Sequence, residues 1–198
     1  MTAAHTFPHR WSYFILLTLL YLLATSQAIQ SFSYKWTTIA THKQYSLDKT
    51  LEFETPKPYI YRVFMPYIVN VLIDSAPSTL LKKLIERSNN TLQANIGSEF
   101  ELMSDKAVAA YAVIILLDFI FLFLTLWALR AASKITIRNG NLISNVVTDF
   151  CPVLFSLMLT LSYRVENGFI YDHLELLCLS IYVLSTMHRN SLLSIMTL

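Results

Sequence analysis

The sequence predicts an all-α fold: a polytopic transmembrane bundle of about four spans, with an interfacial helix in a long first extracytoplasmic loop. Of 198 residues, 55% are hydrophobic and only 14% are charged, whereas about 25% are charged in a typical soluble domain. Several stretches also approach the roughly 20 apolar residues that a helix needs to cross a bilayer. The length fits a single membrane domain over residues 1–198.

Four segments are predicted to span the membrane, residues 11–29, 107–129, 142–163 and 169–187. The first carries no charge, and a cleaved signal peptide is its alternative. A retained anchor is favoured because no small-x-small cleavage site follows the run. The third contains Pro152, which can kink a helix. The fourth is the weakest, because Asp172, His173 and Glu175 crowd its first turns.

The predicted extracytoplasmic loop, residues 30–106, holds most of the charges. Inside it, residues 59–76 are apolar but too short to span, which predicts an interfacial or re-entrant helix. Pro58 can start this helix, Pro66 can bend it and Pro77 ends it.

A second short helix is predicted after Ser78, which can cap it. Four apolar side chains share one face of that helix: Leu80, Leu81, Leu84 and Ile85. Residues 88–98 are predicted to be a polar linker.

The basic residues of the short loops predict the orientation, because such residues favour the cytoplasm. Arg130, Lys134 and Arg138 follow the second span, whereas only Arg164 lies between the third and fourth. The N-terminus is therefore predicted to be cytoplasmic.

This orientation places two candidate arginines, Arg62 and Arg164, at the outer membrane surface together with three carboxylates, Asp48, Glu52 and Asp172. Arginine can clamp a phosphate, and a carboxylate can act as a base toward a hydroxyl. A structural explanation competes with each of these roles. Interfacial Arg and Tyr are ordinary anchors, and Asp172 can pair with Arg164 or stabilise a helix N-terminus.

Two further carboxylates, Asp118 and Asp149, lie inside predicted spans. Because an ionised carboxylate is costly in a bilayer, each is expected to face other helices. A structural bond between helices is favoured for both, and a proton or ion relay is the alternative.

Metal, redox and nucleic-acid functions have no support in the sequence. Cys151 and Cys178 lie in apolar segments and are expected to be buried small hydrophobes. The acidic and histidine residues show no metal-ligand spacing, so neither a metal nor a cofactor is expected. A net charge of +2 gives no nucleic-acid footprint.

The stretch from Pro58 to Pro66 reads Pro-Tyr-Ile-Tyr-Arg-Val-Phe-Met-Pro. It resembles the Pro-x-x-Tyr-Arg-Val-x-x-Pro motif of a family of bacterial polytopic integral membrane proteins, many described as glycosyltransferase-like. Tyr171-Asp172 is similar to the pair that opens a later span in that family. Family members continue through further spans, so the chain is expected to be a short or truncated member.

The resemblance implies an inner-membrane protein that acts on a polyprenyl-phosphate-linked sugar at the outer face. Tyr61, Arg62 and Arg164 would then bind the substrate, and Asp48, Glu52 or Asp172 would supply the base. The alternative is a non-enzymatic small membrane subunit, or a remnant, that binds other membrane proteins. The expected partners are the lipid bilayer in both cases and no nucleic acid.

Overall fold

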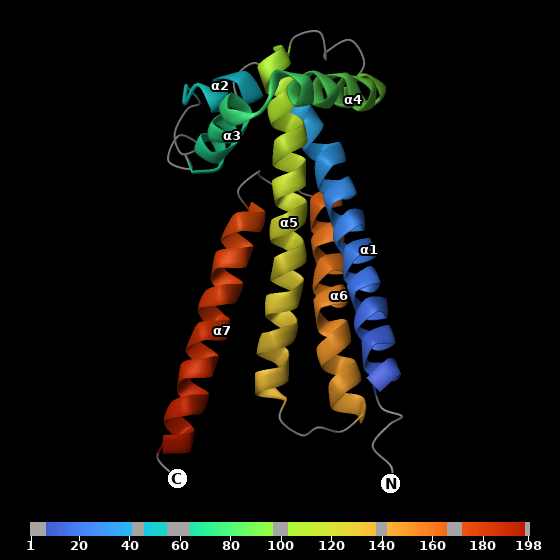
Figure 1. Cartoon of the computed structure of the whole chain (residues 1–198), viewed down its shortest axis with the longest axis vertical. Helices are drawn as coiled ribbons and strands as arrows, with labels where there is room; N and C mark the ends of the chain where they lie inside the picture. The colour runs from blue at the N-terminus through green and yellow to red at the C-terminus, as the bar shows by residue number, and fades with distance from the viewer. Residues whose placement is uncertain are drawn as a thin grey trace. The chain divides into compact units, whose positions relative to one another are not determined.

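The computed structural model describes residues 7–40, 46–54, 64–96, 103–137, 142–165 and 172–196. The regular structure in these ranges is entirely helical, which confirms the all-α prediction (Figure 1). The helices are α1 (Phe7–Ala40), α2 (Leu47–Leu51), α3 (Phe64–Ser75), α4 (Ser78–Ile96), α5 (Asp105–Thr136), α6 (Leu142–Val165) and α7 (Asp172–Met196).

Three helical segments of the described chain are long and apolar enough to cross a membrane, judged by length and composition: Trp11–Tyr34, Asp105–Thr136 and Ile143–Val165. They contain or overlap the first three predicted spans. The fourth predicted span falls mostly within α7, which is not among these three. A crossing by α7 therefore stays a prediction.

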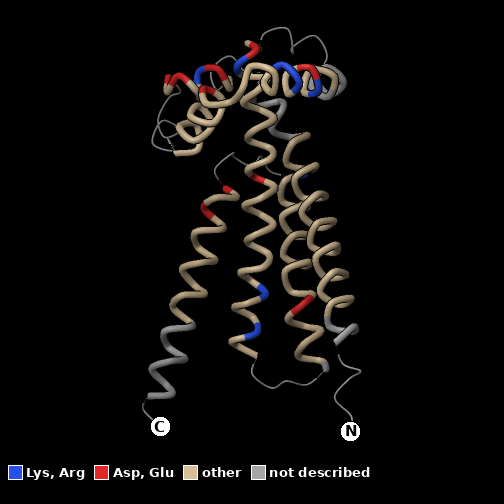
Figure 2. The backbone as a smooth tube through the Cα atoms, viewed as in Figure 1, with Lys and Arg blue, Asp and Glu red and all other residues tan. Residues whose placement is uncertain are grey.

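The chain divides into two compact units. Unit 1 comprises Met1–Ala28, Phe121–Leu161 and His173–Leu198, and unit 2 comprises Ile29–Ile120 and Ser162–Asp172. Figure 2 shows that the charges of unit 2 gather in α2, α4 and the ends of the neighbouring helices, whereas α5 and α6 carry few charges along their length.

Two helices extend further than the sequence predicts, and the prediction of a polar linker from residue 88 was wrong. Helix α1 continues to Ala40, so residues 30–40 are helical. Helix α4 continues to Ile96, so residues 88–96 are not a linker. The reason is that no Gly or Pro interrupts the chain between Pro77 and Gly97, and polar side chains alone do not end a helix.

The apolar helix of the loop is α3, which begins at Phe64, and residues 55–63 lie outside the described part of the chain. Pro66 is the third residue of α3 and does not bend its middle as predicted. In the first turn of a helix the backbone N–H has no intrahelical partner, so a proline is tolerated there. Helix α3 ends two residues before Pro77, as expected.

Contacts among α1, α2, α3 and the start of α5 stabilise unit 2. The Ser33 and Tyr111 hydroxyls of α1 and α5 lie 2.5 Å apart. In the first turns of α5 the small side chains of Ala107, Ala109 and Ala110 are fully buried. Small residues allow helices to approach closely. Asn70 Nδ2 of α3 donates to the Leu51 carbonyl at the end of α2, at 2.9 Å.

Helix α6 buries mainly polar side chains and exposes apolar ones. On α6 the buried positions recur every three or four residues, at Asp149, Pro152, Ser156 and Thr160. The Ser156 hydroxyl donates to the Ala24 carbonyl of α1 at 2.9 Å. The opposite face of α6 exposes large apolar side chains, namely Ile143, Phe150, Leu154, Leu157 and Leu161. Hydroxyl bonding between helices and an apolar outer face are typical of proteins embedded in lipid.

Candidate functional site

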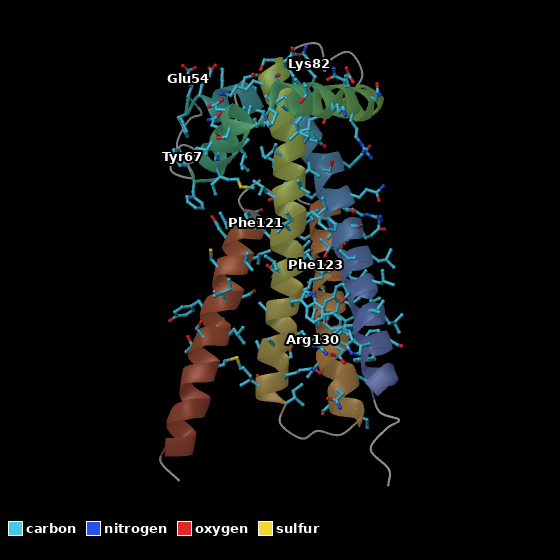
Figure 3. All side chains as sticks on the ribbon, in the orientation of Figure 1. Glu54, Tyr67, Lys82, Phe121, Phe123 and Arg130 are labelled. Carbon is cyan, nitrogen blue, oxygen red and sulfur yellow. The ribbon has the colours of Figure 1, made fainter. Side chains whose placement is uncertain are left out.

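The most developed polar cluster of the described chain lies in unit 1, where α1, α5 and α6 contribute Tyr13, Tyr21, Trp127, Arg130 and Asp149. We call these five residues the polar centre. Each comes from a predicted span or its edge. Arg130 is labelled on α5 in Figure 3.

An ion pair forms the middle of the polar centre. Arg130 Nε donates to Asp149 Oδ1 at 2.6 Å, with 16% of the arginine side chain and 3% of the aspartate side chain exposed. Tyr13 donates a hydrogen bond to the other carboxylate oxygen, Asp149 Oδ2. Both oxygens of the carboxylate therefore accept a hydrogen bond, which a buried charge requires.

A second tyrosine binds the backbone at the same residue. The Tyr21 hydroxyl donates to the Asp149 carbonyl at 2.9 Å. Three residues further on, Pro152 has no N–H, so the α6 ladder lacks a donor in this turn. The carbonyl that loses its intrahelical donor at Pro152 is that of Thr148, which is next to the carbonyl that the phenol binds.

Aromatic rings cover the ion pair. The Trp127 ring centroid lies 5.3 Å from that of Phe14 and 5.2 Å from that of Tyr21. The Arg130 guanidinium carbon lies 5.3 Å from the Trp127 centroid, within the range of a cation–π contact. The arginine is therefore held by a carboxylate and a ring.

Asp149 thus makes the kind of bond between helices that the sequence analysis favoured for it. The partners of Asp149 were not predicted. Arg130 was interpreted only as an orientation signal, and no role was predicted for Tyr13 or Tyr21. The available signal was the charge of Asp149 inside a predicted span, since a buried charge needs a partner.

The other intramembrane carboxylate, Asp118, lies in unit 2 and is fully buried. Tyr163 of α6 is also buried and belongs to the same unit. The Tyr163 ring also packs against Phe32 of α1, with centroids 5.4 Å apart.

The candidate residues of the outer surface are placed only in part. Asp48 lies in α2, where Oδ1 accepts a hydrogen bond from Ser104, the residue before α5. Glu52 follows α2 and is exposed, and Arg164 is exposed near the end of α6. Tyr61 and Arg62 lie outside the described residues.

Ser104 also caps α5, because its hydroxyl oxygen accepts a hydrogen bond from the Ala107 N–H at 3.1 Å. The hydroxyl thus links Asp48 to the first turn of α5. Asp48 therefore has a structural contact through Oδ1.

Metal binding has no support in the described ranges, where no group of three or more His, Cys, Asp or Glu residues could hold an ion. The prediction that both cysteines are buried was wrong, because Cys151 and Cys178 are exposed. On the helices of a membrane protein an apolar residue can face outward as readily as inward, so hydrophobicity did not predict burial.

No protein-family model, no curated protein and no solved structure matches this chain. The resemblance to the Tyr-Arg-Val family therefore rests on the motif from Pro58 to Pro66.

Proposed function

We propose that this chain is a non-enzymatic subunit of a bacterial inner membrane that binds other membrane proteins. The three long apolar helices found in the described ranges are consistent with a multi-pass protein embedded in a lipid bilayer. The observation that carries the proposal is the polar centre. Its carboxylate uses both oxygens to hold helices together, through Arg130 and Tyr13.

Asp48 follows the same pattern in unit 2, where it binds Ser104 at the start of α5. Lys106, in the first turn of α5, lies 3.7 Å from Asp74 at the end of α3. Several charges of the described chain thus connect one helix to another, as expected of a scaffold that presents its surface to partners.

The proposed orientation has the N-terminus in the cytoplasm. Arg130 and Lys134 lie in the last turns of α5, and basic residues near the ends of spans favour the cytoplasmic side. Helices α2, α3 and α4 then lie on the outer side.

Activity and assembly distinguish a subunit from an enzyme. Purified protein, reconstituted with a polyprenyl-phosphate-linked sugar and an acceptor, is expected to transfer no sugar. In native membranes solubilised in mild detergent, it is expected to migrate in an assembly larger than its own oligomer. Sugar transfer by the purified chain would refute the subunit role.

The second candidate is the lipid-linked-sugar site that the motif resemblance implies. Arg164 is the second-last residue of α6 and Asp172 begins α7, and both belong to unit 2. In this function Tyr61, Arg62 and Arg164 would hold the phosphates. A base would come from Asp48, Glu52 or Asp172.

Arg62→Lys tests this candidate, because it replaces a two-pronged donor by a point charge. A phosphate clamp predicts loss of most of the transfer activity at unchanged membrane abundance. The matched control is Arg87→Lys, at an exposed position of α4, which should leave transfer unchanged. Equal activity of the Arg62 variant and wild type would exclude the clamp.

A further inference from the structure

Helix α3 exposes an apolar stripe that no part of the described chain covers. Phe64, Tyr67 and Val71 recur at intervals of three and four residues, so they share one face. Their exposed fractions are 63%, 59% and 45%. Large contiguous apolar surfaces are unusual in contact with water. We call these three residues the α3 stripe.

The opposite face of α3 packs inside unit 2. Met65, Val69 and Ile73 are buried, and Asn70 binds the Leu51 carbonyl of α2. The helix is therefore fixed in rotation, and the α3 stripe points away from unit 2 as a consequence of this packing. A small rotation of α3 about its axis would therefore not bury the α3 stripe.

The position of α3 along α5 identifies what covers the stripe. In Figure 3, Glu54 and Lys82 lie beside the end of unit 2 where α5 begins, whereas Tyr67 lies farther along the direction in which α5 runs. The first turn of α5 carries Asp105 and Lys106, and from Ala107 to Tyr111 its residues are buried and uncharged. Tyr67 thus lies at the level of the apolar part of a spanning helix.

We infer that the α3 stripe inserts into the phospholipid leaflet in which α5 begins, at the boundary between headgroups and acyl chains. Helix α3 has 12 residues, fewer than the roughly 20 needed to span, but a short helix can lie in the interface with its apolar face in lipid. Tyrosine is enriched at this boundary because its ring is apolar and its hydroxyl is polar. This inference holds whether the chain is a subunit or an enzyme.

The alternative lipid contact is electrostatic, through Lys82 and Lys83 of α4, which are exposed. Figure 3 places Lys82 away from Tyr67. Insertion of the stripe requires no anionic lipid, because apolar burial drives it. Zwitterionic phosphatidylcholine alone is therefore a sufficient probe, and the result should not depend on salt.

The test measures the surroundings of single nitroxide labels on the full chain in phosphatidylcholine nanodiscs. Cys151 and Cys178 are first replaced by alanine, since both are exposed. Labels at Tyr67→Cys, at Met65→Cys on the buried face and at Glu86→Cys on α4 are compared. Collisions with oxygen report lipid, and collisions with a water-soluble nickel chelate report water.

We expect oxygen to exceed the nickel chelate at position 67, the reverse at position 86, and low values of both at position 65. An excess of the nickel chelate at position 67 would place the stripe in water. Low accessibility to both would show that protein covers it, such as a second copy. Either result overturns the inference.

A charge placed in the stripe gives an independent readout. With the label at Val71→Cys, Tyr67→Asp should invert the ratio of oxygen to nickel accessibility, because a carboxylate is driven out of the acyl region. Lys82→Asp on α4 is the matched control and should leave the ratio unchanged. The inference fails if Tyr67→Asp also leaves the ratio unchanged, with the protein still folded.

Discussion

Replacement of Asp149 by leucine is expected to destabilise the bundle strongly, because it leaves the Arg130 charge without its carboxylate. In wild type the two side chains meet at 2.6 Å with Asp149 almost fully buried. Arg130→Leu should also be destabilising, since it leaves the carboxylate with only the Tyr13 hydrogen bond. The double variant Arg130→Leu/Asp149→Leu removes both charges and should recover much of the loss.

The magnitude follows from the burial of the pair. Removing one partner of a buried ion pair costs about 3–5 kcal/mol. Arg130 keeps 16% of its side chain exposed and keeps its contact with Trp127, so the lower end applies to Asp149→Leu. A cost of about 3 kcal/mol lowers the ratio of folded to unfolded protein by roughly two factors of ten.

The assay is unfolding in mixed micelles of dodecyl maltoside with increasing sodium dodecyl sulfate. Tryptophan emission is a suitable signal because Trp127 packs on Tyr21 and Arg130. The four proteins form a double-mutant cycle, for which we expect a coupling free energy of about 2–3 kcal/mol between the two positions. Additive effects, with a coupling below about 0.5 kcal/mol, would refute the assigned role of the pair.

Three further predictions concern the cap of α5, the second buried carboxylate and the topology. Ser104→Ala should lower the free energy of unfolding by about 1 kcal/mol through loss of the cap of α5, measured in the same unfolding assay. Asp48→Ala should cost less, because the cap remains. Equal stability of Ser104→Ala and wild type would contradict this prediction. Asp118→Asn keeps the hydrogen-bonding capacity but removes the titratable proton. This variant should stay abundant and correctly assembled, as measured by native electrophoresis, whereas Asp118→Leu should not. Loss of function in Asp118→Asn at unchanged abundance would instead support a proton relay. A reporter that is active only outside the cytoplasm should be active when fused after Gln93 and silent after Asn139, and the opposite pattern would overturn the orientation.

The spanning helices were predictable because their signal is local. A run of apolar residues of sufficient length identifies a span without knowledge of its neighbours, and three predicted spans coincide with long apolar helices. Helix ends were less predictable. The extension of α4 to Ile96 depends on the absence of a breaker in a polar segment, which hydropathy does not register.

The polar centre was only half predictable, because its members are far apart in the chain. Asp149 lies 19 residues from Arg130 and 136 residues from Tyr13. The sequence indicates that a carboxylate in a span needs a partner, but several residues are chemically suitable. Selection among them depends on which faces of α1, α5 and α6 meet. The same limit explains why the cysteines were assigned to the wrong side of their helices.

Because α5 is long, its fit to the membrane depends on the thickness of the bilayer. Its 32 residues extend about 48 Å at a rise of about 1.5 Å per residue, well beyond a hydrocarbon core of about 30 Å. Lys106 and Arg130 lie about 36 Å apart along the same axis, with Asp118 midway between them. A thinner bilayer must be met by tilt or by local lipid deformation, each at modest cost. Membranes of different thickness should therefore differ in how readily they retain this chain.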